Sequence, residues 1–225
     1  DSSIMPTEQL TVGCWINPDT WAFTGNAQNR FPFGCRAGGG WVVGFENNYN
    51  ATVTTFAGHI YVSDNGTGSA GYLSVETDSD YSVGLRSQTG WHYIAFTYTK
   101  ATGVAALYMD GKEVLNATGA TGADIAYHPS IDEPLTFGAD AHSSGGEDYF
   151  EGNIDEPSVW NTALSAAELL AVYNNGIPIN LLSNTGDYVS SSDLQGWWRM
   201  GDPNGSTAYP TIKDVSGNTN DGTMT

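Results

Sequence analysis

The sequence predicts an all-β protein, a sandwich of short strands with one short helix. Its 225 residues include 28 glycines, 12 tyrosines and 7 tryptophans, and only 14% are charged, a composition that favours strands joined by tight turns. Apolar and polar residues alternate over several short runs, whereas a single segment has the signals of a capped helix. The length suffices for one large sandwich, so we expect one main domain.

The strand-like runs follow one another along the chain, separated by clusters of Gly, Asn, Asp and Ser. They lie at 10–16, 41–45, 51–56, 59–63, 71–75, 91–98 and 103–109. Asp110-Gly111 is the strongest hairpin signal, because this dipeptide suits the tight turn between two paired strands. Long loops, where function most often lies, are expected at 24–30, 64–70, 117–130 and 139–149.

The helix is expected over about three turns near 165–175. Ser165 and Glu168 have the spacing of a capping box, and Leu164 and Leu169 can staple its entry. Gly176 supplies a left-handed stop at the other end.

Three segments resemble laminin-G-like and pentraxin-like domains. Residues 150–170 have the order of the closing part of these domains, a Gly-x-Ile-Asp-Glu strand followed by a Leu-Ser-x-x-Glu helix. Residues 90–98 with 107–114 resemble their paired strands, and residues 10–18 resemble their first core strand. The resemblance implies a concanavalin A-like jelly-roll β-sandwich of two antiparallel sheets over residues 1–180.

Residues 181–225 form a C-terminal extension whose Trp-rich run, 194–202, resembles the beginning of such a domain. Either a second domain starts here, or this strand completes the sheet of the first domain. We favour the second alternative, because the 32 residues after Asp193 could not bury a core of their own. The Trp-Trp-Arg-Met-Gly-Asp segment at 197–202 also resembles laminin-G-like modules of marine bacteriophage virion proteins, which implies a virion or extracellular location.

The charge balance is strongly acidic. Seven Lys and Arg stand against 25 Asp and Glu, giving a net charge of −18, so we expect no nucleic-acid partner. No apolar run approaches the roughly 18 residues of a membrane span, so no membrane insertion is expected. Cys14 and Cys35 allow one disulfide, but two free core thiols suit the spacing equally well.

Enzymes share this sandwich, so the strand at 153–157 was compared with the glucanase pattern Glu-(Ile/Leu)-Asp-x-(x)-Glu. Retaining glycosidases need two carboxyl groups about 5–5.5 Å apart. Asn153 stands where the nucleophile would be, and Pro157 or Ser158 stands where the acid/base would be. The sequence therefore predicts no enzyme and no catalytic residue. Glycoside hydrolysis would require two carboxylates from distant loops to meet on the concave face of the sandwich.

Calcium is the expected cofactor, because it takes oxygen ligands from carboxylates and loop carbonyls. Asp140, Glu147 and Asp148 lie in the loop where pentraxin-like domains carry calcium ligands, although an ordinary acidic turn is an equal alternative. Asp155 lies on the strand where related sandwiches hold a structural calcium. A third acidic group consists of Asp214, Asn218, Asn220 and Asp221, for which a simple turn is favoured.

Four aromatic residues near loops or strand ends are candidates for stacking on sugar rings. They are Trp21, Tyr49, Tyr127 and Tyr149. For each of them, a packed cover over the sandwich is the favoured alternative. Five tryptophans lie within apolar runs and are expected in the core, namely Trp15, Trp41, Trp91, Trp160 and Trp198.

These expectations combine into a functional hypothesis from fold analogy, which is a weak guide to function. The first hypothesis is a non-catalytic, calcium-dependent carbohydrate- or surface-binding module on a virion or extracellular assembly. Its partner would be a glycan or cell-surface ligand. The alternative is a structural virion protein, a capsid decoration or fibre that contacts neighbouring subunits, with homo-oligomerisation left open. A glycoside hydrolase is the least favoured hypothesis.

Overall fold

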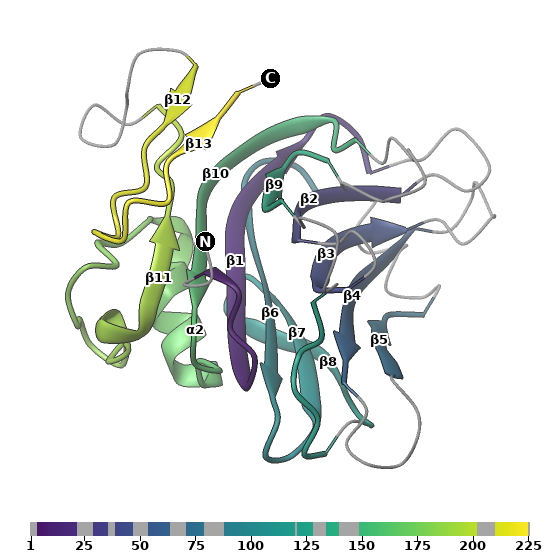
Figure 1. Ribbon diagram of the computed structural model, residues 1–225. Coiled ribbons are helices and arrows are strands. Elements are labelled where there is room, and N and C mark those ends of the chain that lie inside the picture. Colours follow the sequence, from purple (N-terminus) through teal and green to yellow (C-terminus); the bar gives the residue numbers. More distant parts are fainter. Residues whose placement is uncertain are drawn as a thin grey trace.

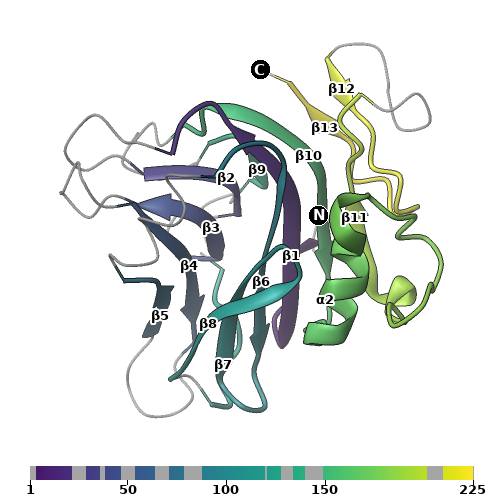
Figure 2. The same ribbon diagram turned by 180° about the vertical axis from the view of Figure 1, so that it is seen from behind.

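The molecule is a two-layer β-sandwich with an added cover on one side. The computed structural model describes residues 4–21, 29–35, 39–46, 54–63, 71–78, 88–119, 121–127, 134–139, 149–201 and 210–224. Two antiparallel sheets pack face to face, and α2 (Ala166–Tyr173) with the C-terminal segment lies against the outer side of one of them (Figures 1 and 2). This arrangement confirms the predicted all-β sandwich with one short helix.

Each sheet brings together strands that are distant in sequence. The six-stranded sheet has the spatial order β11 (Leu194–Trp197), β10 (Gly152–Trp160), β1 (Gln9–Pro18), β6 (His92–Thr99), β7 (Val104–Met109) and β8 (Lys112–Thr118). The five-stranded sheet has the order β5 (Gly71–Glu76), β4 (Thr55–Val62), β3 (Trp41–Glu46), β2 (Asn29–Cys35) and β9 (Thr136–Phe137). A small ribbon of β12 (Thr211–Ile212) and β13 (Gly222–Thr223) follows, and short 3-10 turns lie at Asn174–Gly176 and Ser191–Asp193.

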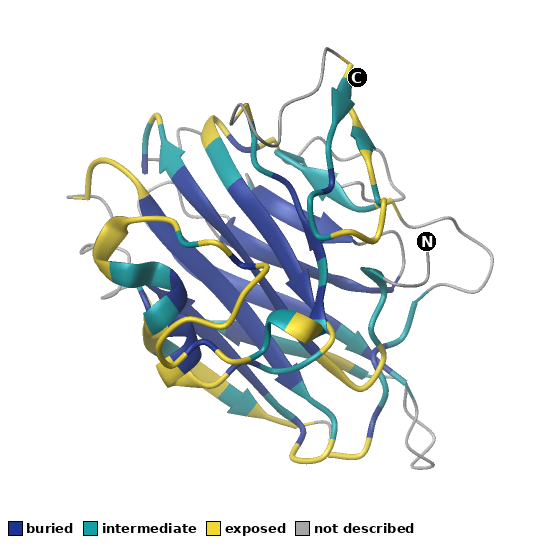
Figure 3. Cartoon of the chain, turned by 90° about the vertical axis from the view of Figure 1, so that its left-hand side faces the viewer, coloured by how far each residue is buried: buried dark blue, intermediate teal, exposed yellow. Residues whose placement is uncertain are grey.

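The central strands of the six-stranded sheet, β10, β1, β6 and β7, are buried on both faces over most of their length, whereas the edge strand β8 is largely exposed. In β6, Ile94 and Phe96 point into the core between the sheets, whereas Tyr93 and Ala95 point into a second apolar cluster beneath α2. Successive strand residues point to opposite faces, so the unbroken apolar and aromatic run from Tyr93 to Phe96 matches burial on both sides. Figure 3 shows these strands buried along most of their length.

Most of the predicted strand runs are present, with two differences. The runs 51–56 and 59–63 were expected to be separate strands, but Thr55–Val62 is one strand, and residues 51–53 lie outside the described residues. The loop expected at 24–30 overlaps β2, which begins at Asn29. No strand was predicted over 29–35, where Pro32 and Gly34 interrupt the apolar residues.

The Asp110-Gly111 hairpin between β7 and β8 is confirmed. Both residues have positive φ angles, 51° and 73°, as a type I′ turn requires. A Cβ at Gly111 would lie 2.8 Å from the Cα of Leu170 in α2. Glycine therefore serves the turn and also lets the helix approach it closely.

The predicted capping box of α2 is confirmed. The Glu168 N–H donates to Ser165 Oγ at 3.3 Å, and the Ser165 N–H donates to Glu168 Oε2 at 3.0 Å. The predicted stop at Gly176 was wrong, because Asn174 already adopts the left-handed conformation (φ 44°) and ends the helix after eight residues. Asn tolerates this conformation better than most residues, so the helix has about two turns.

The Trp-rich strand of the C-terminal extension continues the six-stranded sheet, because β11 pairs with β10, with Trp197 opposite Ser158. The buried carboxylate of Glu156 fixes this edge: it accepts hydrogen bonds from the Trp197 indole N–H and, at 3.2 Å, from Arg199 Nε. Glu156 has a φ of 53° beside an irregularity in the β1–β10 register, which is typical of a β-bulge that redirects a side chain.

Cys14 and Cys35 are both buried in the core between the sheets and form no disulfide. Of the two alternatives, the structure therefore has two core thiols. Within the described ranges, no helix is long and apolar enough to cross a membrane.

Candidate ligand-binding face

The outer face of the five-stranded sheet carries polar and aromatic side chains from three neighbouring strands. Cross-strand partners share a face, and the register sets Glu46 opposite Thr55, and Tyr61 opposite Tyr72. The intervening pairs, such as Phe45 with Phe56, belong to the core. We call the side chains of Glu46, Thr55, His59, Tyr61, Tyr72 and Glu76 the sheet-face cluster.

Tyr72 is the exposed aromatic ring of the sheet-face cluster, with 49% of its surface accessible. It stacks on the imidazole of His59 at a centroid distance of 5.1 Å and an interplanar angle of 14°. Tyr61 meets it edge-on at 5.1 Å. Two supporting rings therefore restrict the Tyr72 ring, which presents its remaining surface to a ligand without first having to be ordered.

His59 anchors this stack from below and is itself buried. Its Nε2 lies 2.8 Å from Glu46 Oε1, and the ring of Phe31 meets it edge-on at 6.3 Å. The other ring nitrogen, Nδ1, has no hydrogen-bond partner among the described residues. A buried polar atom without a partner is costly and uncommon in folded proteins.

Thr55 contacts both neighbouring strands of the cluster. Its hydroxyl lies 3.0 Å from Glu76 Oε1 and 3.2 Å from the Glu46 carbonyl oxygen. The Phe56 N–H also donates to Thr77 Oγ1 at 2.9 Å, which ties the end of β5 to β4. The cluster thus combines an aromatic surface with fixed carboxylate acceptors, a combination suited to a ligand with apolar ring faces and hydroxyl donors.

Trp21, one of the proposed sugar platforms, lies in the core with 7% of its surface exposed. Its ring packs edge-on against Phe45 at 5.0 Å, and its carbonyl accepts a hydrogen bond from the Thr54 hydroxyl at 2.9 Å. In this position it covers the sandwich, as the alternative interpretation held, and it offers no ring face to a sugar.

The other three aromatic residues proposed to stack on sugar rings differ in their surroundings. Tyr149 is 55% exposed and remains available for stacking. Tyr127 is partly buried and donates its hydroxyl to the Pro6 carbonyl at 3.0 Å. Tyr49 lies outside the described residues.

The expectation for the five tryptophans was wrong at one position. Trp91 is 46% exposed, because it precedes β6 and is not part of the paired strand. The other four are buried, as predicted: Trp15, Trp41, Trp160 and Trp198.

The predicted calcium ligands of the 139–149 loop, Asp140, Glu147 and Asp148, lie outside the described residues. Asp155 is described, and its Oδ1 accepts the N–H of Glu156 at 2.8 Å. The described part of the chain contains no group of three or more His, Cys, Asp or Glu side chains that could hold a metal ion. The residues described around Asp155 thus give no ligand set for calcium, and its role as a ligand stays a prediction.

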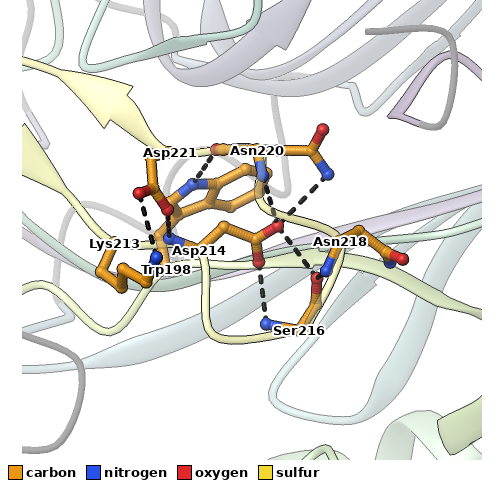
Figure 4. A network of polar contacts seen from close by, with 7 residues as sticks. All are labelled: Trp198, Lys213, Asp214, Ser216, Asn218, Asn220 and Asp221. Atoms are coloured by element: carbon orange, nitrogen blue, oxygen red, sulfur yellow. Dashed lines mark hydrogen bonds and ion pairs between the residues drawn. The ribbon is translucent and has the colours of Figure 1, made fainter.

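The third acidic group is a hydrogen-bonded turn, as the favoured alternative held (Figure 4). The carboxylate of Asp214 is buried and accepts five hydrogen bonds, from Trp197 N, Ser216 N and Oγ, and Asn220 N and Nδ2. Donors fill the directions in which this carboxylate could hold a cation, so Asp214 stabilises the turn.

The sheet-face cluster did not stand out in the sequence. Its residues lie in the predicted strands or, for Glu46 and Glu76, directly after them, yet each is an isolated polar or aromatic residue at an alternate position. The alternation of side chains along each strand could have indicated it. Glu46, His59, Tyr72 and Glu76 lie at the alternate positions that face away from the core residues of their strands. Their proximity depends on the strand register, which single runs do not reveal.

A family model described as the concanavalin A-like lectin/glucanases superfamily, of the laminin G type, matches residues 1–170. A search of curated protein sequences finds no match. Solved structures share the fold at low sequence identity. A proposed carbohydrate-binding protein of Bacteroides ovatus is 18% identical with a TM-score of 0.62, and the match covers 95% of this chain but 51% of that protein. The chain therefore spans about half the length of that relative.

Two further structures extend the comparison. The heptameric SAP-like pentraxin of Limulus polyphemus is 16% identical with a TM-score of 0.51, covering 98% of this chain and 87% of its own. The CBM40 module of the Ruminococcus gnavus IT-sialidase, in the form bound to α2,6-sialyllactose, is 14% identical with a TM-score of 0.55 and covers 76% of this chain and 86% of its own. The structural neighbours thus include carbohydrate-binding modules, and at these identities the likeness shows the fold alone.

Proposed function

Because the chain belongs to the concanavalin A-like lectin/glucanases superfamily, we propose that it is a non-catalytic carbohydrate-binding module that binds glycans on the sheet-face cluster. The observation that carries the proposal is Tyr72, a half-exposed ring held by the His59 stack beside two carboxylates. The carbohydrate-binding names of the Bacteroides ovatus protein and of the CBM40 module support the ligand class.

In this proposal one sugar ring lies on the exposed face of Tyr72. The contact buries apolar surface of both rings, at roughly 25 cal/mol per Å². The carboxylates of Glu46 and Glu76 accept hydrogen bonds from sugar hydroxyls. The module binds and does not cleave, because Asn153 and Pro157 occupy the positions at which a related glucanase would carry its carboxylates.

We further propose that calcium assists binding through Asp140, Glu147 and Asp148, beside Tyr149, and that a structural calcium contacts Asp155. Carboxylates and loop carbonyls are the ligands that calcium prefers. Display on a virion or another extracellular assembly remains part of the proposal, and it rests on the resemblance of residues 197–202 to phage modules.

A structural virion protein is the second candidate function. Exposed apolar residues favour it: Leu170 of α2 and then Ile177, Leu182 and Val189 are exposed along the segment that follows the helix. Exposed apolar side chains that form a continuous patch mark contact surfaces between proteins. In that case, neighbouring subunits would bind this side of the molecule.

The test is a glycan screen with and without calcium, followed by calorimetry of the strongest ligand. Tyr72→Ala should weaken binding at least about tenfold, whereas Tyr72→Phe should retain most of it, because the ring face remains. Trp91→Ala is the matched control, since this ring is 46% exposed but lies just before β6, a strand of the other sheet. Unchanged affinity in Tyr72→Ala would overturn the sheet-face proposal. Binding to no glycan in either condition would favour the structural alternative.

A further inference from the structure

A second candidate site lies at the opposite edge of the five-stranded sheet from Tyr72. There a hollow of about 340 Å³ opens between β9 and the turn that precedes β13. Its lining residues are Ile4, Leu135, Phe137, Trp198, Thr219, Asn220, Asp221 and Gly222. Pockets for small molecules measure about 300–1,000 Å³, so this one has room for a single small ligand and not for an extended chain.

The base of the hollow is aromatic and apolar. The rings of Phe137 and Trp198 contact each other at a centroid distance of 5.0 Å, and Ile4 and Leu135 pack beside them against the core. Phe137 is only partly buried, unlike Trp198. The base therefore offers the hollow an aromatic surface on which a flat apolar ligand face can pack.

The rim is a polar turn that its own hydrogen bonds hold in place (Figure 4). The Trp198 indole N–H donates to the Asn220 carbonyl at 2.9 Å, and the Asp214 N–H donates to Asp221 Oδ1 at 3.0 Å. Lys213 Nζ lies 3.0 Å from Asp221 Oδ2 and neutralises its charge. Because the turn is ordered without a ligand, little conformational entropy is lost when one binds.

We infer that this hollow is a second, independent site, which takes a single neutral sugar residue. The ring face packs on Phe137, and hydroxyl groups bond to Asp221 and Thr219 at the rim. The ligand is neutral because the charge on the rim is already paired. The ligand class rests on the proposed function, but the site shares no residue with the sheet-face cluster. Four strand spacings, about 19 Å, separate the two edges of the sheet.

The experiment is a nuclear magnetic resonance titration with methyl glycosides of neutral hexoses and N-acetylhexosamines, with the indole N–H signal of Trp198 as the reporter. We expect this signal to shift and saturate with at least one glycoside. Gly222→Ile should weaken that binding at least tenfold, because a Cβ there lies in ordinary contact, 3.6 Å from Ile212 and 4.0 Å from Phe137, and a larger side chain fills the hollow. Thr223→Ile places the same side chain on the neighbouring exposed residue and should change nothing.

If Gly222→Ile does not fold, Phe137→Leu serves in its place, since it removes the ring and keeps an apolar residue. Tyr72→Ala should leave the Trp198 titration unchanged, which separates this site from the sheet-face cluster. A Trp198 signal that no glycoside shifts would overturn the inference, even if Tyr72-dependent glycan binding is observed. Full binding in Gly222→Ile or Phe137→Leu would overturn it as well. Loss of the sheet-face function alone would leave the Trp198 titration intact.

Discussion

Replacing Asp214 by Ala should destabilise the C-terminal extension more than any other single change in that turn. The carboxylate is buried and accepts five hydrogen bonds, three of them from main-chain N–H groups. A buried donor left without a partner costs about 1–3 kcal/mol, and the N–H of Trp197 is fully buried, whereas those of Ser216 and Asn220 can partly reach water. We therefore expect a loss of about 3 kcal/mol.

For a chain of this length, about 3 kcal/mol corresponds to a fall in melting temperature of roughly 6–12 °C. Calorimetry measures the fall, and hydrogen exchange at the Trp197 amide shows whether the loss is local to β11. Asp221→Asn is the control, because it breaks only the surface ion pair with Lys213 and should cost less than about 1 kcal/mol. If Asp214→Ala melted within 2 °C of the wild type with an unchanged Trp197 exchange rate, the turn would not depend on this carboxylate.

Four further outcomes follow from the described contacts. Glu168→Ala should cost about 1–2 kcal/mol by loss of the helix cap. Burial alone would raise the pKa of Glu168, but hydrogen bonds from Ser and main-chain donors outweigh burial and lower that pKa. The contribution of Glu168 to the free energy of unfolding should therefore disappear as pH falls below about 4, which denaturation curves measured from pH 3 to 7 would show. At Glu156, burial raises the pKa despite the nearby Arg, so its contribution to stability should fall as pH rises above about 4.3, and Glu156→Gln should remove that slope. Gly111→Ala should destabilise more than Gly122→Ala in thermal melts, since both have positive φ angles but only the first has a neighbour, the helix, within 4 Å. Burial raises the pKa of the Cys14 thiol, so a thiol reagent should modify it only on unfolding, and rapid reaction in the native protein would contradict its burial.

The features predicted correctly from the sequence are those with local causes. The Asp110-Gly111 turn and the Ser165–Glu168 capping box depend on residues at most three positions apart, so their signals lie within a few letters. Gly58 shows where local signals fail, because it lies between the runs 51–56 and 59–63, which were predicted as separate strands, although Thr55–Val62 is one strand. A Cβ there would lie 2.5 Å from Phe96 Cδ2 of the opposite sheet, so the glycine allows close packing across the sandwich inside one strand.

The candidate site was harder to predict for the same reason. Tyr72, His59 and Glu46 come from three strands, and only the register places them together. Trp21 was expected near a ligand and packs in the core, while Trp91 was expected in the core and is exposed. Both lie just outside a strand, where alternation no longer tells which way a side chain points.

The most direct test of glycan binding at the sheet face is a crystal structure of the protein with the strongest ligand of the glycan screen. The account predicts a sugar ring stacked on Tyr72, with hydroxyl groups bonded to Glu46 or Glu76. A glycan bound elsewhere, with Tyr72 left uncovered, would contradict it.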